Sequence, residues 1–464
     1  MYHKLSMRFL PATSEFGCPG PRIISQDEVR RNFPYLDTKY KWGVVVYDGE
    51  MDDTRLLMEA FLTASQDGYI PGMKGANMVN YARLDKFVKD STGKITGVEV
   101  YDKVNKKTFV VKSKHVVNAT GNFTDVVRRM DDPSIGYRIV HALGTHVMLD
   151  RSFCSRDMGI LIPKTSDGRV LFCVPWLQGT TVGTTDVILP DPSIHPTPSA
   201  SCVEFLAHEA KELFPIFRDQ PFESCIKSKW AGTRPLVLKH DQELRDTAQS
   251  LSGKDISRSH AIIEAPSGLV SAVGGKWTTF RRMGEEVMTL LLQRDEPGLT
   301  AIPSEKSTRN MRFIGDYRSG VAGKPLAIKG VKQHQQYVET LVRELDIKYG
   351  SLGLPLLSHL ARCYGIRSLD ILEMIAKEPK LGERLHPNFE TTQAEIVYQI
   401  RSEMVVNVFD LLLRRNRLAF LDRKAAEDVM PMTVELLGSE LGWSDDQKRR
   451  NLAEALEIYQ KMEF

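Results

Sequence analysis

Two glycines separate an apolar run from a helical pattern within residues 269–281. The run Leu269–Val273 is short and rich in β-branched residues, which is typical of a buried strand. After Gly274 and Gly275, apolar residues recur at helical spacing. A strand that turns sharply through glycines into a helix presents backbone N–H groups and the positive end of the helix dipole. The segment could therefore bind negative charge. An ordinary strand–turn–helix connection is the alternative on these residues alone.

Three side chains are of types that bind phosphate or move protons. Arg234 precedes Pro235, which favours an extended backbone, and Arg258 lies between two serines. A guanidinium donates two parallel hydrogen bonds and suits a phosphate dianion. His146 lies in the alternating run Gly144–Met148, and an imidazole suits a general base near neutral pH. A solvated arginine and a hydrogen-bonded interior histidine are the corresponding structural alternatives.

The elements around these residues can be predicted from turn residues and hydrophobic spacing. We expect strands at 43–47, 114–120, 168–175 and 180–186, the last two as neighbours, and a hairpin of 97–101 with 108–111. Asp52 and Asp53 should cap a helix. From about residue 303 the pattern is helical. Capping boxes at Thr392 and Ser444 should open one helix that continues to Leu411 and a final helix.

Composition excludes several classes of protein. The 464 residues include 62 Lys and Arg against 59 Asp and Glu, and a net charge of +3 does not suggest a nucleic-acid partner. The six cysteines are far apart without a C-x-x-C motif, so we expect no metal site and no disulfide framework. No apolar run reaches the roughly 20 residues of a membrane-spanning helix. Residues 1–20 show no signal-peptide core and no clear transit peptide.

Several motifs occur in one order along the chain. They are Val116–Gly121, Gly183–Asp186, Trp230–Leu236, Ile256–Arg258 and Leu269–Arg281. In this order they resemble the FAD-dependent glycerol-3-phosphate dehydrogenases. Segments 47–51, 165–170 and 417–421 are most similar to the mitochondrial branch. The resemblance runs from about Phe33 to the end of the chain.

This resemblance implies an α/β fold with an α+β cap. It predicts a D-amino-acid-oxidase-like FAD-binding fold with an incomplete Rossmann-type domain and a C-terminal all-α domain. We expect a partial FAD-binding domain with the start of the substrate region at 1–125 and a β-rich substrate or cap domain at 126–258. The chain should return to the FAD-binding domain at 259–300 and end in a helical domain at 301–464.

The resemblance also implies a reaction and a site. The reaction is oxidation of sn-glycerol 3-phosphate to dihydroxyacetone phosphate, with FAD as cofactor and a quinone as electron acceptor. His146 would be the base, with His141 as the nearest competitor, and Lys276 would stabilise charge electrostatically. Arg234 would serve in both catalysis and substrate binding, with Arg258 and Thr185 as further substrate-binding residues. Thr184 and Asp186 match a segment near the substrate. The expected FAD-binding residues are Ala119, Thr120, Gly121, Gly274, Gly275, Lys276, Trp277, Thr278 and Thr279.

The sequence also departs from the family pattern. No Gly-x-Gly occurs, so the G-x-G-x-x-G fingerprint is missing, and we expect FAD to bind weakly or not at all to the chain as written. Asn122 stands where a proline is usual. A non-catalytic or truncated remnant and a related flavin oxidase acting on another small substrate are the alternatives; the two arginines argue against the second. The resemblance further implies a peripheral protein of the mitochondrial inner membrane, and a homodimer.

Overall fold

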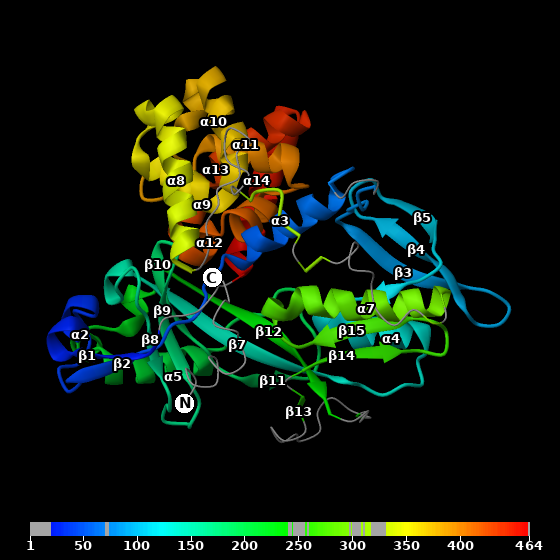
Figure 1. The fold of residues 1–464 in the computed structure, drawn as a ribbon, viewed down its shortest axis with the longest axis horizontal. Helices are drawn as coiled ribbons and strands as arrows, with labels where there is room; N and C mark the ends of the chain where they lie inside the picture. Colours follow the sequence, from blue (N-terminus) through cyan, green and yellow to red (C-terminus); the bar gives the residue numbers. More distant parts are fainter. Residues whose placement is uncertain are drawn as a thin grey trace.

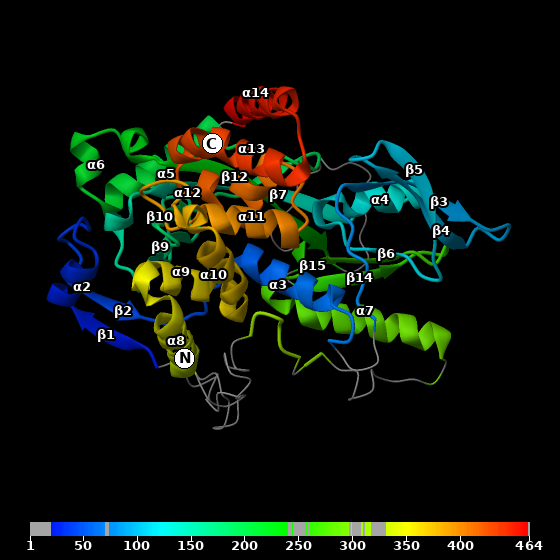
Figure 2. The same ribbon diagram turned by 90° about the horizontal axis from the view of Figure 1, so that it is seen from above.

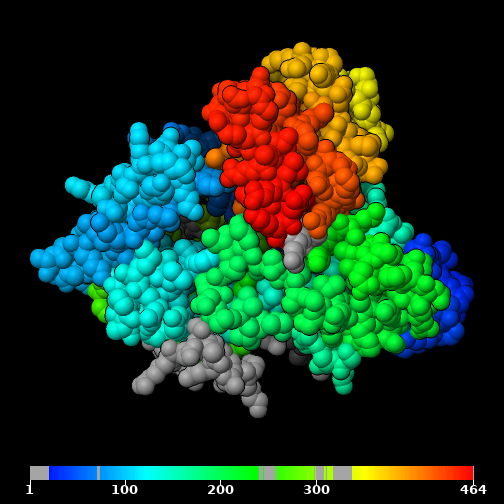
Figure 3. Space-filling model, turned by 180° about the vertical axis from the view of Figure 1, so that it is seen from behind, coloured from blue at the N-terminus to red at the C-terminus, as the bar shows by residue number. Residues whose placement is uncertain are grey.

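The computed structural model describes residues 20–69, 74–239, 244, 256–257, 259–296, 298, 308–309, 311–316 and 331–462. Figure 1 shows three neighbouring parts: a large β-sheet, a smaller α/β part beside it, and a helical part packed above the large sheet. From behind, the C-terminal helices sit directly on the residues of the large sheet (Figure 3). The architecture agrees with the predicted α/β fold with a helical C-terminal region.

The large sheet is antiparallel and is centred on one long strand, β7. Its order is β13-β12-β7-β10-β9-β8, and β11 also pairs with β7. The strands are β7 (Ile139–Leu149), β8 (Ile160–Ile162), β9 (Leu171–Trp176), β10 (Gly179–Gly183), β11 (Val187–Leu189), β12 (Ser228–Leu238) and β13 (Ile256–Ser257). One face of β7 packs on α5 (Ala200–Leu213) and α6 (Ile216–Asp219), where Val147 and Leu149 meet Leu206 and Phe214. The opposite face of β7 is therefore directed toward the helical part and carries the candidate site.

The smaller α/β part contains the strand, glycine turn and helix predicted at 269–281. Strand β15 (Val270–Gly274) pairs with β14 (His260–Glu264) and, in parallel, with β6 (Val117–Asn118). Helices α4 (Thr124–Asp131) and α7 (Phe280–Asp295) flank this sheet (Figures 1 and 2). The buried strand predicted at 114–120 is wrong in length and partly in burial. Only two residues pair, and Val117 is exposed.

The remaining strands form two small sheets. The predicted hairpin is confirmed within the sheet of β3 (Ala82–Lys89), β4 (Ile95–Asp102) and β5 (Lys107–Lys112). The strand predicted at 43–47 is present as β2 (Trp42–Val45), which pairs with β1 (Arg22–Ser25), and α2 (Gln26–Asn32) follows β1. Asp52 caps α3 (Asp53–Ser65), as predicted. Strands β9 and β10 are neighbours, as predicted, and they pair in antiparallel orientation, but β10 ends at Gly183 and not at residue 186.

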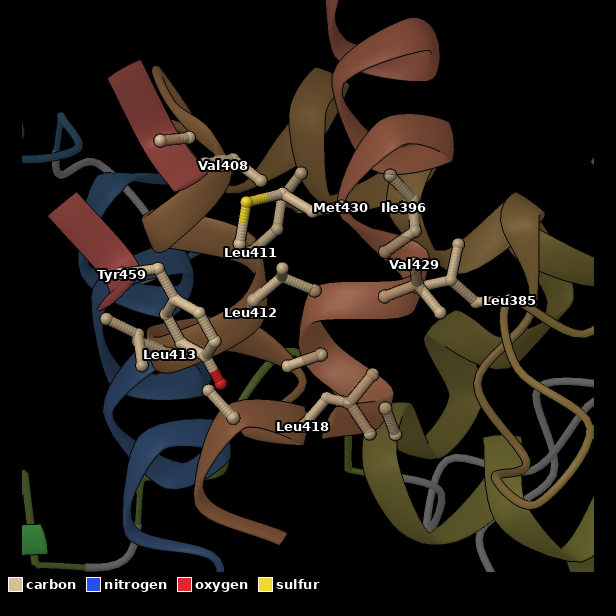
Figure 4. Packing of buried hydrophobic residues seen from close by; sticks show 14 of the residues in the cluster. Leu385, Ile396, Val408, Leu411, Leu412, Leu413, Leu418, Val429, Met430 and Tyr459 are labelled. Carbon is tan, nitrogen blue, oxygen red and sulfur yellow. The ribbon is translucent and has the colours of Figure 1, made fainter. Parts of the chain in front are cut away.

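The helical part is built from seven α-helices within the described residues. They are α8 (Val331–Tyr349), α9 (Leu354–Tyr364), α10 (Ser368–Lys377), α11 (Gln393–Ser402), α12 (Leu418–Leu421), α13 (Arg423–Leu441) and α14 (Asp445–Lys461). Both predicted capping boxes are present, at Thr392 and Ser444. Leu411, Met430 and Tyr459 are among the side chains that fill the core (Figure 4).

The single helix predicted from Thr392 to Leu411 is wrong. Helix α11 ends at Ser402, Met404 has a positive φ of 55°, and a separate π-helical segment spans Asp410–Arg415. Asp410 explains part of this break, because its carboxylate accepts the backbone N–H groups of Val406 and Asn407. The apolar spacing continues through the break, so the pattern alone could not locate it.

A buried ionic cluster attaches α3 to the helical part. The Arg55 guanidinium donates to both carboxylate oxygens of Glu403, at 2.9 and 2.7 Å. Arg367 donates to Glu403 at 3.2 Å and to Glu59 at 2.7 Å. The Glu403 side chain is 0% exposed, and the two arginine side chains are 7% and 8% exposed. The Glu403 carboxylate therefore neutralises the positive charges of Arg55 and Arg367, whose side chains are almost inaccessible to water.

Removing Glu403 should destabilise the fold strongly. Glu403→Ala leaves the buried guanidinium groups of Arg55, Arg367 and Arg415 without their shared carboxylate, and loss of one partner from a buried pair costs about 3–5 kcal/mol. Glu440→Ala is the matched control, because Glu440 pairs with an exposed arginine, Arg401. It should change the free energy of unfolding by less than about 1 kcal/mol. Urea unfolding measures both. Equal losses would show that the cluster does not hold α3.

Candidate active site

His146 lies at the centre of the large sheet, on the face that looks toward the helical part. His146 lies in β7, and it is paired with Gly183 of β10 on one side and with Trp230 of β12 on the other. Its ring stacks on the Trp230 indole, with centroids 5.6 Å apart and planes 12° apart. A Cβ at Gly183 would lie 2.3 Å from His146 Cδ2, so the missing side chain makes room for the imidazole. The strand predicted around His146 is confirmed.

The imidazole of His146 is held neutral and has an unused nitrogen. Burial, and to a smaller extent the positive charge of Arg234, lower the pKa of His146 to about 4. Within the described part of the chain, no group lies within hydrogen-bonding distance of its buried Nδ1. A buried polar atom without a partner is costly unless a ligand or water satisfies it. This differs from the hydrogen-bonded interior histidine that was the structural alternative.

Arg234 extends its guanidinium along the same face of the sheet. A Cβ at Gly144 would lie 2.6 Å from Arg234 Nη2, so the guanidinium lies against the bare backbone of β7. Nη2 donates to Thr184 Oγ1 at 2.9 Å, and Nη1 pairs with Asp186 Oδ1 at 3.0 Å. The Arg234 and Asp186 side chains are 38% and 55% exposed. Since Gly144 is two residues from His146, a cation and a neutral base share one surface.

Thr185 and His141 lie elsewhere. The Thr185 hydroxyl is buried and accepts the backbone N–H of Thr145 at 2.9 Å, and only its carbonyl is near Arg234, at 3.5 Å. His141 is five residues before His146 in the strand, hence on the opposite face. Its Nδ1 lies 3.3 Å from Asn122 Oδ1, and burial lowers its pKa although Asp125 and Asp191 oppose that effect. Arg258 lies outside the described residues.

The expected cofactor residues gather at the carboxyl ends of the parallel strands β6 and β15. Ala119, Thr120 and Gly121 follow β6, and Gly274 ends β15 with Gly275 directly after it. Open α/β sheets bind ligands at this edge. The three glycines have positive φ values of 57°, 81° and 73°, and a Cβ at Gly121 would meet nothing within 4 Å. Gly121 therefore leaves open space at this edge, whereas a Cβ at Gly274 or Gly275 would meet Val237 or His260.

The two strand ends also reach the large sheet. Asn122 Nδ2 donates to the Thr233 carbonyl at 2.6 Å, directly before Arg234. A Cβ at Gly274 would lie 2.4 Å from Val237 Cγ2, three residues after Arg234. Trp277–Thr279 form a short 3-10 turn that leads into α7. Lys276 is exposed, and within the described chain it forms no hydrogen bond or ion pair with His146 or Arg234.

Sequence reasoning did not single out the aromatic wall beside His146. Trp230 contacts Trp176 at 6.1 Å and Phe420 at 5.3 Å between centroids, and the Arg417 guanidinium lies over both of those rings. A cavity of about 570 Å³ opens beside Trp230. Leu57, Met58, Ile194, Leu413, Phe420 and Met462 are among its apolar lining residues. Trp230 and Phe420 stand inside motifs of the family resemblance, but no spacing rule brings segments 190 residues apart together.

The described residues lack two further features. They contain no group of three His, Cys, Asp or Glu side chains arranged to hold a metal ion. They also contain no helix with the length and hydropathy needed to cross a membrane.

Two family models match most of the chain. One, described as FAD dependent oxidoreductase, matches residues 4–281. The other, described as the C-terminal domain of alpha-glycerophosphate oxidase, matches residues 308–448. Together they cover the regions predicted to bind flavin and to form the helical domain.

Curated relatives and a solved structure are similar over nearly the whole chain. Probable mitochondrial glycerol-3-phosphate dehydrogenase of Caenorhabditis elegans is 33% identical over 93% of this chain and 55% of its own length. Mitochondrial glycerol-3-phosphate dehydrogenase of Homo sapiens is 33% identical over 95% and 57%. The chain thus spans little more than half the length of these relatives. Glycerol-3-phosphate dehydrogenase from Bacillus halodurans, solved with FAD, superposes with a TM-score of 0.72 at 24% identity, over 96% of this chain and 82% of that one.

Proposed function

The chain belongs to the FAD-dependent oxidoreductase family, and on that premise we propose that it oxidises the secondary hydroxyl of sn-glycerol 3-phosphate to the ketone of dihydroxyacetone phosphate. One observation carries the proposal: Arg234 and a neutral His146 with an unused buried nitrogen share one face of the sheet. A cation beside a base suits a substrate that combines a phosphate with an alcohol.

Arg234 binds the substrate phosphate in this proposal. Its guanidinium is already oriented by Thr184 and Asp186, so little ordering is needed on binding. Asp186 is more than half exposed, and a phosphate dianion would replace its carboxylate as the partner of Arg234. Arg258 and Thr185 are the further substrate-binding residues proposed from the family resemblance; Thr185 would act through its carbonyl, which lies 3.5 Å from Arg234 Nη1, because its buried hydroxyl already accepts the Thr145 N–H.

His146 accepts the proton of the C2 hydroxyl. Because its pKa is about 4, the imidazole is deprotonated at neutral pH and ready to act as a base. Stacking on Trp230 fixes the ring plane. Lys276 contributes positive charge near the developing alkoxide.

Bound FAD would supply the hydride acceptor. We propose that Ala119, Thr120 and Gly121 together with Gly274–Thr279 hold its ring end. The turn at Gly121 supports this assignment, because a Cβ there would meet nothing within 4 Å and its backbone is open to a ligand.

A quinone is the proposed final electron acceptor. The cavity beside Trp230 supports this choice, since many of its lining side chains are apolar and it opens next to the ring that stacks on His146. Peripheral attachment to the mitochondrial inner membrane and a homodimer are proposed from the family resemblance and from relatives named mitochondrial.

The proposal is tested by assaying protein reconstituted with excess FAD, because weak FAD binding is expected, with sn-glycerol 3-phosphate and a soluble quinone analogue. We expect equal amounts of reduced quinone and dihydroxyacetone phosphate, and far slower turnover with glycerol, which offers Arg234 no phosphate. Oxygen consumption with peroxide release in place of quinone reduction would favour an oxidase. No turnover by protein with stoichiometric flavin would favour a non-catalytic remnant.

A further inference from the structure

A cysteine, a histidine and a glutamate lie in line in the helical part, away from the candidate active site. His359 and Cys363 are one turn apart on α9, and the distance from Cys363 Sγ to His359 Nδ1 is 3.7 Å. The other ring nitrogen, Nε2, lies 2.9 Å from Glu395 Oε1 of α11. A nucleophile, a base and a third group that orients the base form the arrangement of side-chain nucleophiles in enzymes.

The glutamate is held so that it fixes the histidine. Glu395 is 2% exposed. Its Oε2 accepts the Thr392 backbone N–H at 2.7 Å, and its Oε1 also accepts the Tyr364 hydroxyl at 3.1 Å. A carboxylate held in this way accepts a hydrogen bond from Nε2–H, so the proton of a neutral His359 stays on Nε2 and Nδ1 is unprotonated and faces the thiol. The tautomer needed to take the thiol proton is therefore the one that Glu395 selects.

The charges nearby favour the protonated form of His359. Burial by itself lowers the pKa of His359, but the charges of a Cys363 thiolate and of Glu395 raise it well above its usual value. Arg55 of α3 adds a further cation, since its Nε donates to the Cys363 carbonyl at 3.1 Å. Positive charge close to a cysteine is what makes its sulfur reactive.

Cys363 is more exposed to solvent than most of the other cysteines that the structure describes. Cys154, Cys173 and Cys202 are buried, whereas Cys363 and Cys225 are partly exposed. Cys154 and Cys173 lie 3.6 Å apart. The hydrogen bond with Cys154, together with burial, raises the pKa of Cys173 well above its usual value, so the Cys173 thiol stays protonated. Cys225 contacts Gln220 and Ser224 and no imidazole.

We propose that Cys363 is a site of covalent modification, a nucleophilic thiol that reacts with hydroperoxides by means of His359 and Glu395. The thiol proton passes to His359 Nδ1, and the sulfur attacks one peroxide oxygen. The S–O bond forms as the O–O bond breaks, so sulfur is oxidised to a sulfenic acid and the peroxide is reduced. The leaving oxygen takes the proton back from His359 and departs as water, or as an alcohol from an organic hydroperoxide.

The first test uses the unmodified protein. Limiting hydrogen peroxide is added with dimedone, which traps sulfenic acids, and each cysteine is quantified by mass spectrometry. Cys363 should be labelled about tenfold or more faster than Cys225, which matches it in exposure but lacks a base. Equal labelling of the two would overturn the proposal, and this comparison needs no variant to fold.

The second test assigns the reactivity to the histidine. His359→Asn should slow labelling of Cys363 by about tenfold while the rate at Cys225 stays the same. His386→Asn is the control, because His386 caps an exposed turn through Asn388 and has no thiol nearby. Unchanged labelling of Cys363 in folded His359→Asn would refute the role of the imidazole. Neither test depends on glycerol 3-phosphate oxidation, so this site and the proposed function can fail separately.

Discussion

Replacing His146 with alanine in the FAD-bound protein should lower turnover of glycerol 3-phosphate by roughly 10²–10⁴. The variant loses the group proposed to take the C2 hydroxyl proton. It keeps the glycine turns proposed to hold the flavin, so bound flavin should remain at the wild-type level. Steady-state kinetics and flavin absorbance measure the two quantities on the same preparation.

The His146→Ala variant should also change the pH dependence of turnover. His146 is active when deprotonated, so wild-type turnover should fall as the pH drops through about 4, the pKa of this residue. That limb should vanish in His146→Ala. A limb near pH 6 from the substrate phosphate, whose second pKa is about 6, should remain in kcat/KM. Near-normal turnover of His146→Ala, or a larger loss in His141→Asn with its fold intact, would remove His146 from the reaction.

Arg234→Ala should raise the KM for glycerol 3-phosphate by about a hundredfold or more, because charge-assisted bidentate hydrogen bonds to a phosphate contribute at least two factors of ten. Oxidation of glycerol, which has no phosphate, should change far less. Arg218→Ala is the matched control. Arg218 also pairs with an aspartate, Asp37, but in an exposed position away from the site. Equal losses with both substrates would mean that Arg234 supports the fold.

Arg234→Ala should also change the pH dependence of turnover, which reports the protonation of His146. The positive charge of Arg234 contributes to the lowered pKa of His146, although burial is the larger cause. Removing the guanidinium should therefore move the acid limb of turnover to higher pH, but not to the value of an exposed histidine. Arg234→Lys restores the charge without the planar fork and should return the limb toward its wild-type position while KM stays raised. An unmoved limb in Arg234→Ala would show that the two residues do not interact.

Local chemistry in the sequence was enough to predict many elements. Asp52, Thr392 and Ser444 cap helices where their side chains can accept backbone N–H groups, and each cap involves residues only two or three positions apart. The strand, glycine turn and helix at 269–281 were also predicted from residues close together in the sequence. The helix predicted from Thr392 to Leu411 was wrong because α11 ends at Ser402 while the hydrophobic spacing continues, and Asp410 accepts the backbone N–H groups of Val406 and Asn407 beyond that end.

Family motifs identified the candidate site residues, but the contacts that each residue makes depended on the tertiary structure. Thr184 and Thr185 are adjacent in the same motif, yet the Thr184 hydroxyl accepts from Arg234 and the Thr185 hydroxyl accepts the backbone N–H of Thr145. Both lie in the irregular connection between β10 and β11, so neither their place in the motif nor strand alternation predicts which of them reaches the site. Asn122 is a departure from the family pattern, and only the fold shows that it ties its turn to β12.

By itself, the sequence determined the types of element, the caps, the family and the residues that could do chemistry, because these depend on neighbours along the chain. Tertiary structure alone decided that His146 stacks on Trp230 with a free nitrogen and that Arg234 pairs with Asp186. It also decided that Arg55 meets Glu403, 348 residues away. Such contacts arise from strand register and from the packing of elements distant in sequence. The burial that lowers the pKa of His146 is a property of that packing and of no motif.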